Sequence, residues 1–192
     1  MITPAISVLT ICGIAEIPSH GPRAVSHVLS VIDPDRPELT EFSSFGEHHR
    51  TTLRFHDIID PQAGLVMPER AHMESILDFG SSLANDAEPG AQGHLLVHCH
   101  MGVSRSTAAM VTLMLQARED ASEEALFEEL RAIRPQAWPN SVMIGMADDM
   151  LGRSGRLVDA LRGHYAHQIK VQPELPKWMA SMGRGREVEM AR

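Results

Sequence analysis

Residues 97–106 read VHCHMGVSRS and place Cys99 and Arg105 six positions apart. Three apolar residues at 95–97 come before this stretch and a helix-forming stretch follows it, so we expect a strand, a loop and a helix. The five residues between Cys99 and Arg105 can turn their backbone N–H groups toward an anion, and the positive end of the helix dipole points at the same place. The stretch therefore predicts a site where a thiolate meets a phosphoryl group.

The residue types in this stretch suit that chemistry. A cysteine attacks as a thiolate, which a helix N-terminus and a nearby cation favour. Arg105 offers a planar guanidinium that binds two oxygens of one phosphate, a geometry that lysine lacks. Ser106 can donate a hydrogen bond to the Cys99 sulfur and ease its departure from a cysteinyl-phosphate. Gly102 supplies a residue that is free to take positive φ.

We assign phosphate binding to the loop as a whole. A buried cysteine at a strand end is by itself more often a small hydrophobic residue, and an arginine in a first helical turn is more often solvated. The combination of strand, cysteine, loop, arginine, serine and helix is what indicates a site. We expect Ser104 to brace the loop and His100 to border the substrate mouth. The predicted phosphate-binding residues are His100, Met101, Gly102, Val103, Ser104 and Arg105.

The pattern His98-Cys99-x5-Arg105-Ser106, with Gly102 inside it, resembles the signature loop of the protein tyrosine phosphatase superfamily, which includes the dual-specificity phosphatases. The resemblance implies a cysteinyl-phosphate intermediate, no metal or other cofactor, and an aspartate acid on a separate loop. It also implies that the imidazole of His98 orders the loop by hydrogen bonding.

A second match lies downstream, where residues 134–140 read RPQAWPN. This segment is similar to the Arg-Pro…Pro-Asn segment that follows the signature helix in dual-specificity phosphatases. The resemblance covers roughly residues 25–150. It favours a phosphatase over a rhodanese-type sulfurtransferase, which also carries a cysteine on a loop before a helix.

The proton donor must lie on another loop. Residues 53–61 read LRFHDIIDP, a strand with inward-facing Leu53 and Phe55 that runs into a loop. The resemblance implies an acid just after such a strand, which favours Asp57. Asp60 comes before a proline, competes for the same role and equally suits a turn. Both aspartates stay candidates.

Composition limits the class of protein. The chain has 192 residues and is 43% hydrophobic, enough for one α/β domain with a proper core. Its two cysteines, Cys12 and Cys99, argue for a reducing compartment. A net charge of −8 argues against nucleic acid or an anionic membrane as partner. We expect a cytoplasmic protein, because the apolar run at 6–15 has no preceding Lys or Arg and the apolar segment at 108–115 is too short to span a bilayer.

Strands alternate with helices along the chain, which predicts one α/β domain with a central mixed or parallel sheet flanked by helices. The predicted strands are Ile6–Ile11, Val25–Ile32, Thr51–His56 and Leu95–His98, with a polar loop at Asp86–Gly93. The predicted helices are Gly13–Ile17, Pro68–Ala84, Ser106–Ala117, Ser122 to about Ile133, Asn140 to about Leu151, and Arg156–Ala166.

The domain itself is predicted to span residues 1–167. Residues 168–192 contain two prolines and a Gly-Arg-Gly-Arg run, and we expect them to form a loosely ordered extension without a chemical role. The Asp148-Asp149 pair is interpreted as a solvated helix face.

A metal site is not expected at His98, Cys99 and His100, because adjacent residues of an extended segment point to alternate sides and no zinc-type spacing accompanies them. The expected partner is a phosphorylated protein or a small phosphate ester. The loop lacks the lysines of phosphoinositide-directed relatives, and the single tyrosine, Tyr165, comes late, which favours a shallow site of the dual-specificity kind. A non-catalytic phosphoresidue-binding module and a sulfurtransferase remain the alternatives; the oligomeric state is not predicted.

Overall fold

A computed structural model describes residues 6–85 and 93–191. The loop predicted at Asp86–Gly93 therefore lies outside the described residues, except for Gly93. The strands are β1 (Ile6–Gly13), β2 (His27–Ile32), β3 (His49–Arg54) and β4 (Gly93–Cys99). The helices are α1 (Arg70–Asn85), α2 (Arg105–Ala117), α3 (Glu123–Ile133), α4 (Ser141–Met150), α5 (Arg156–Val171), α6 (Leu175–Met179) and α7 (Gly185–Met190). Three further helical segments complete the order: η1 (Ile14–Arg23), η2 (Thr40–Phe42) and η3 (Ala180–Arg184).

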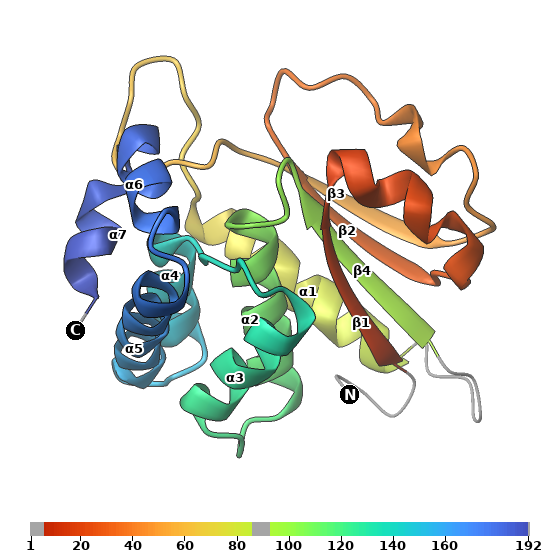
Figure 1. Cartoon of the computed structure of the whole chain (residues 1–192). Coiled ribbons are helices and arrows are strands. Elements are labelled where there is room, and N and C mark those ends of the chain that lie inside the picture. Colours follow the sequence, from red (N-terminus) through yellow and green to blue (C-terminus); the bar gives the residue numbers. More distant parts are fainter. Residues whose placement is uncertain (1–5, 86–92, 192) are drawn as a thin grey trace.

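The four strands form one sheet in the order β1-β4-β2-β3, and every neighbouring pair is parallel. The predicted α/β class with a parallel sheet is confirmed. β4 lies inside the sheet and is buried along nearly its whole length, as a continuous apolar run in a parallel sheet requires. Because all strands run the same way, the loops that follow β2, β3 and β4 leave the sheet at one edge (Figure 1).

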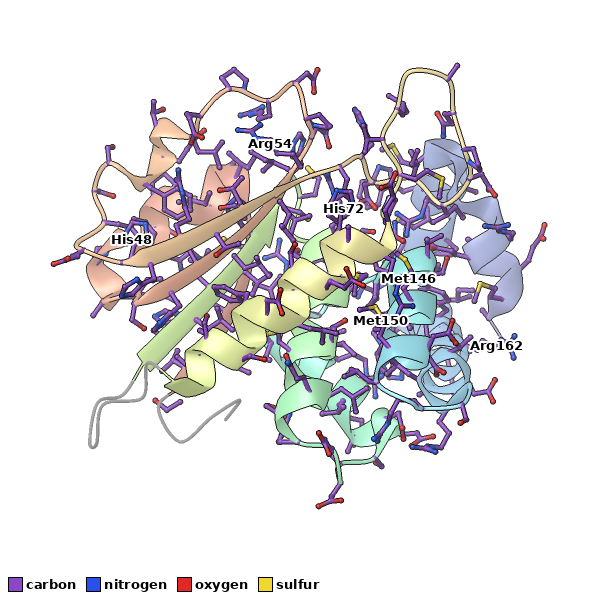
Figure 2. The ribbon with its side chains drawn as sticks, turned by 180° about the vertical axis from the view of Figure 1, so that it is seen from behind. His48, Arg54, His72, Met146, Met150 and Arg162 are labelled. Atoms are coloured by element: carbon purple, nitrogen blue, oxygen red, sulfur yellow. The ribbon has the colours of Figure 1, made fainter. Side chains whose placement is uncertain are left out.

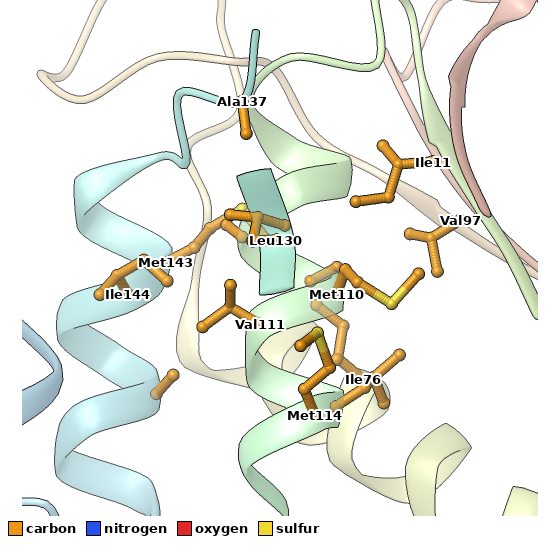
Figure 3. Packing of buried hydrophobic residues seen from close by; sticks show 14 of the residues in the cluster. Ile11, Ile76, Val97, Met110, Val111, Met114, Leu130, Ala137, Met143 and Ile144 are labelled. Carbon is orange, nitrogen blue, oxygen red and sulfur yellow. The ribbon is translucent and has the colours of Figure 1, made fainter. Parts of the chain in front are cut away.

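The two faces of the sheet carry two separate cores. Side chains alternate along β4, so Leu95 and Val97 face the α-helices while Leu96 faces the opposite side with residues of η1 and η2. On the helical side, Ile11 and Val97 point from the sheet toward Met110 of α2 (Figure 3). α2 is buried over residues 105–115, which explains why its sequence is apolar all round.

Helix starts follow the predicted capping residues. The Ser122 hydroxyl accepts from the Ala125 N–H at 3.2 Å, and the Asn140 carbonyl oxygen accepts from the backbone of α4. Asp148 differs from the prediction of a solvated face, because it is 2% exposed. Its carboxylate accepts from the N–H groups of Gly155 and Leu157 at 2.6 and 2.8 Å, so it binds the positive end of α5.

Seen from behind, α1 crosses the molecule diagonally next to the sheet, with His72 near its first turn (Figure 2). Met146 and Met150 lie on the neighbouring α4 and pack against the main core. None of the helices in the described part of the chain is both long and apolar enough to cross a membrane.

The expected loosely ordered extension is helical in the structure. α5 continues to Val171, past the predicted end at Ala166, and residues 175–190 (the C-terminal segment) form α6, η3 and α7. Pro176 lies in the first turn of α6, where a proline is tolerated, and Gly183 takes a φ of +77° where the chain kinks. The segment packs against α5, with Arg184 2% and Glu187 0% exposed.

Candidate active site

The candidate site lies at the edge of the sheet where β4 passes into α2. A cavity of about 320 Å³ opens there and is lined by Cys99, Arg105 and Asp57, among others. Asp33 directly follows β2 and Asp57 comes three positions after β3. Residues that follow neighbouring parallel strands meet at one edge, so residues far apart in sequence line the same cavity.

Cys99 is the last residue of β4, is 2% exposed and lines the cavity. The Ser106 hydroxyl lies 3.2 Å from its sulfur. Cys12 is fully buried in β1 and is absent from the cavity lining. Burial, reinforced by the charge of Glu16, raises the pKa of Cys12 to about 12, so this second thiol stays protonated and unreactive.

Within the signature loop, residues 99–105, the carbonyl groups of residues 100–103 turn away from the cavity and toward neighbouring elements. The carbonyls of residues 100–103 accept, in order, from Ile14 N (3.0 Å), Arg134 Nη2 (3.0 Å), Arg134 Nε (3.0 Å) and Trp138 N (2.8 Å). Since the N–H of the next residue is antiparallel to each carbonyl in the peptide plane, the N–H groups of residues 101–104 point to the opposite side. They have no acceptor among the described residues, which is the arrangement of an anion-binding nest.

Gly102 is required for this loop shape by two independent features. Its φ is +67°, a left-handed conformation that side chains oppose. A Cβ at this position would also lie 2.5 Å from the carbonyl carbon of Cys12, because the loop packs directly on the end of β1. Arg134 supports the same loop from its outer side, because its guanidinium donates to the Gly102 and Met101 carbonyls and also pairs with Glu16 at 2.8 Å.

Arg105 is anchored through one nitrogen and leaves the rest of its guanidinium available. Its Nη1 donates to the Asp33 carboxylate at 2.6 Å and to the Phe55 carbonyl. Its Nε is buried and has no hydrogen-bond partner among the described residues. An unpaired buried donor costs roughly 1–3 kcal/mol, so an anion in the cavity that accepts from Nε gains this energy.

Asp57 accepts three hydrogen bonds at a single oxygen, Oδ1. The donors are Ser104 Oγ (2.7 Å), Asn140 Nδ2 (3.0 Å) and Arg184 Nη1 (3.0 Å). Burial alone raises the pKa of Asp57, but the charges of Arg184 and Arg105 and these hydrogen bonds outweigh it, so the pKa lies below its usual value. Asp60 is outside the cavity lining, its side chain is 52% exposed, and it pairs with Arg186 at 3.0 Å.

Arg184 joins the C-terminal segment to the site. It donates to Asp57, to Ser104 at 2.9 Å, and through Nε and Nη2 to the buried carboxylate of Glu187 at 2.8 and 2.7 Å. Glu187 also accepts from the Trp138 indole N–H (2.8 Å) and the Ser141 N–H (2.7 Å). One buried cation thus bridges two carboxylates, and the segment cannot leave without unpairing both.

Two histidines border Cys99 in sequence and have different surroundings. His98 is fully buried, its Nε2 lies 2.6 Å from the Ser30 hydroxyl, and burial lowers its pKa to about 4. His100 lines the cavity, with its Nε2 3.7 Å from Asp33, and burial lowers its pKa as well. Both imidazoles are neutral at pH 7, so His98 acts as a hydrogen-bonding support and the positive charge beside Cys99 comes from Arg105.

The structure brings most of the predicted site residues together around one cavity and leaves Asp60 outside it. Sequence reasoning missed Asp33 and Arg184. Asp33 shares a signal with Asp57, since both follow a predicted strand, but its place in a Pro-rich breaker cluster indicated only a turn. Nothing in the sequence marks Arg184, because its partner Asp57 is 127 positions away.

No protein-family model matches the sequence. A dual specificity protein phosphatase, MPK-4, from Drosophila melanogaster is 26% identical over 152 residues, which are 78% of this chain and 35% of that protein. The chain thus spans about a third of the length of this relative.

Solved structures with the same fold include human DUSP28, with a TM-score of 0.56, 18% identity, and coverage of 80% of this chain and 95% of that one. DUSP15 has a TM-score of 0.53 at 17% identity and covers 83% and 92% of the two chains. A human tyrosine phosphatase-like serine/threonine/tyrosine-interacting protein has a TM-score of 0.53 at 14% identity, covering 80% and 95%. The resemblance seen in the sequence holds: the chain has the fold of the dual-specificity members of the protein tyrosine phosphatase superfamily, and its Cys-x5-Arg loop joins a strand to a helix of that fold.

Proposed function

We propose that the chain is a cysteine-dependent phosphatase that hydrolyses phosphomonoesters through a cysteinyl-phosphate intermediate. One observation carries the proposal: the buried, unpartnered Nε of Arg105 and the outward-turned carbonyls of the signature loop surround Cys99 with donors that lack acceptors. A tetrahedral dianion supplies the acceptors that such an arrangement needs. A planar arginine side chain, held through Nη1 by Asp33, presents its Nε edge in a fixed orientation.

In the first step the Cys99 thiolate attacks phosphorus, a sulfur–phosphorus bond forms and the ester phosphorus–oxygen bond breaks. The leaving oxygen takes a proton from Asp57, which we assign as the general acid in preference to Asp60 because it lines the cavity. In the second step water attacks phosphorus, Asp57 takes its proton, and the sulfur leaves as a thiolate. The Ser106 hydroxyl, 3.2 Å from that sulfur, donates to the departing charge. The products are an alcohol or phenol and inorganic phosphate.

The mechanism requires Asp57 to be protonated in the first step. Asp57 is held ionised by Arg184 and Arg105, since their charges and two further hydrogen bonds outweigh the effect of burial and lower its pKa. The protonated acid is therefore the minor form at neutral pH, and we expect the rate with poor leaving groups to rise as the solution becomes acidic.

The proposed substrate is a phosphorylated protein or a small phosphate ester. The cytoplasmic location and the domain limit at residue 167 stay predictions. The proposal is tested by hydrolysis of p-nitrophenyl phosphate by the full chain in the presence of EDTA. We expect turnover that is lost in Cys99→Ser and kept in the matched variant Cys12→Ala. Activity that survives in Cys99→Ser, or that requires a divalent ion, contradicts the proposed mechanism.

The second candidate is a phosphoresidue-binding module without turnover. The three donors on Asp57 Oδ1, Arg184 among them, favour it, because they stabilise the carboxylate, which has no proton to donate. Such a protein would bind inorganic phosphate or a phosphopeptide through the signature loop and leave the ester intact. Measuring both phosphate binding and product release on the same wild-type sample separates the two candidates. A rhodanese-type sulfurtransferase is not favoured, because the fold is that of dual-specificity phosphatases.

A further inference from the structure

Exposed apolar side chains gather around the mouth of the candidate site. Among the described residues seven large hydrophobic side chains are exposed. Four of these line the cavity that contains Cys99, and we call them the apolar rim: Leu65, Met101, Trp178 and Met182. Scattered exposed hydrophobic residues need no explanation, whereas a group that surrounds one cavity is typical of a binding surface.

The cavity divides into a polar floor and an apolar mouth. The floor holds the buried groups Ser104 and Arg105, which are 3% and 2% exposed. The rim side chains are far more exposed, from 37% for Leu65 to 61% for Met182. A ligand that fits both parts carries an anionic phosphoryl group at one end and a flat or bulky apolar group next to it.

The size of the cavity restricts the apolar group. Its volume of about 320 Å³ is near the lower limit of ligand pockets, which is roughly 300 Å³. A phosphoryl group with one aromatic ring suits this space, and an extended lipid or a nucleotide does not. Two methionines and a tryptophan are suited to a ring, since thioethers contact ring edges and indoles stack on ring faces.

We propose that the apolar rim binds the ring of an aryl phosphate monoester, so that the C-terminal segment makes the site selective for aryl over alkyl phosphates. The proposal rests on the proposed function, because the signature loop must hold the phosphoryl group. A phosphotyrosine side chain and a free aryl phosphate share the required chemistry. An alkyl phosphate, such as a phosphoserine side chain, places little apolar surface against the rim.

The C-terminal segment holds half of the rim in a fixed position. Trp178 and Met182 lie on either side of Met179, which is 2% exposed and packs into the core. Arg184, two residues after Met182, is bonded to Asp57 and Glu187. The rim is therefore formed before a ligand arrives, and binding does not require ordering of the segment.

The proposal is tested with phosphonates, whose phosphorus–carbon bond is not hydrolysed. Titration calorimetry on the full chain compares phenylphosphonate with methylphosphonate. We expect phenylphosphonate to bind about tenfold more tightly, the gain of a stacked ring with its buried apolar surface. Trp178→Ala and Met182→Ala should bring the ratio of the two affinities toward one and leave methylphosphonate binding unchanged. Val171→Ala, an exposed residue on α5 outside the cavity, should leave both affinities unchanged.

Equal affinity for the two phosphonates, or an undiminished preference in both rim variants, overturns the proposal. All three substituted side chains are exposed, so truncation leaves the fold intact. Selective phenylphosphonate binding without p-nitrophenyl phosphate turnover would refute the proposed phosphatase activity and support the role of the apolar rim. Turnover without selectivity would support the phosphatase activity and refute the role of the rim.

A second arm distinguishes the source of the aryl group. Cys99→Ser protein is titrated with free phosphotyrosine, a phosphotyrosine peptide and the matching phosphoserine peptide. Tighter binding of the phosphotyrosine peptide than of the free amino acid supports a protein-borne ring, and equal binding supports a free aryl ester. A phosphoserine peptide that binds as well as its phosphotyrosine counterpart contradicts the aryl preference.

Discussion

Replacing Arg184 by methionine removes the cation that joins the C-terminal segment to the candidate site. The variant keeps most of the apolar stem and loses four hydrogen bonds: to Asp57, to Ser104 and two to Glu187. Glu187, which is fully buried, would then lack a countercharge. Its remaining donors are the Trp138 indole and the Ser141 N–H, which carry no full charge.

The expected loss of stability is large. Removing one partner of a buried ion pair costs about 3–5 kcal/mol, against a total of about 5–15 kcal/mol for a domain. For a chain of this size each kcal/mol corresponds to about 2–4 °C, so we expect the melting temperature to fall by roughly 6–20 °C. Thermal and urea unfolding followed by circular dichroism measure the loss. The double variant Arg184→Met/Glu187→Gln should recover part of it, because the unpaired buried charge is gone.

The pH dependence of kcat distinguishes a purely structural role of Arg184 from a role in the candidate site. Burial raises the pKa of Asp57 and the charge of Arg184 opposes this effect, so the pKa of Asp57 rises when that charge is removed. Because the acid must be protonated to act, the alkaline limb of kcat should move to higher pH in Arg184→Met, measured below its melting temperature. A loss of less than about 1 kcal/mol, the range of a surface pair, together with an unmoved pH profile, would refute this account of Arg184.

The other predictions concern the loop and the acid. Arg105→Lys keeps the charge and loses the planar donor edge, so kcat/KM for p-nitrophenyl phosphate should fall by about 10²–10³, and near-native turnover would contradict the role given to Arg105. Asp57→Ala should reduce turnover of phenyl phosphate more than that of p-nitrophenyl phosphate, whereas Asp60→Ala should affect neither; the reverse pattern would move the acid to Asp60. The pKa of Asp57 is lowered in the folded chain. The stability that the Asp57 carboxylate contributes is therefore full above about pH 4 and is lost as the pH falls through the folded-state pKa. The free energy of unfolding in urea should depend less on pH in this range for Asp57→Asn than for the wild type. Gly102→Ala places a Cβ 2.5 Å from the Cys12 backbone on a residue that must keep a left-handed φ, so the loop should lose its shape. Inorganic phosphate should then protect Cys99 from alkylation by iodoacetamide in the wild type and fail to do so in the variant. Retained protection in the variant would show that the loop shape is not needed.

Local patterns predicted the centre of this molecule well. The apolar run of β4, the loop and α2 are adjacent in sequence. A fully apolar strand followed by an apolar helix is compatible with few folds other than a parallel sheet covered by helices. The capping residues Ser122 and Asn140 were predicted for the same reason, because a cap acts on the residues two or three positions ahead.

Features that depend on distant partners were not predictable in this way. In the sequence Asp148 is one of two adjacent charged residues, a pattern typical of a surface. In the structure the N–H groups at the start of α5 donate to its carboxylate, and this contact depends on the fold. The run around Arg184 has the composition of a flexible tail, and its burial depends on Asp57 and Glu187. A charged side chain is buried where it meets a partner of opposite charge. The hydrophobicity pattern of the sequence therefore cannot locate such residues.

The order of strands explains why the site forms at this edge. β1, β4, β2 and β3 are neighbours in that order, and each provides one component at or just beyond its carboxyl end. β1 ends in Gly13, where a Cβ would lie 2.9 Å from the His100 carbonyl, so a bare backbone there lets the loop approach. β4 ends in Cys99, β2 leads to Asp33, which holds Arg105, and β3 leads to Asp57. The sheet and the loops that leave it thus supply the nucleophile, the anchor for the arginine, the candidate acid and half of the apolar rim, Leu65 and Met101. The other half, Trp178 and Met182, comes from the C-terminal segment, and the same Arg184 that fixes the segment also contacts Asp57. Loss of Arg184 should therefore alter substrate preference and acid strength together.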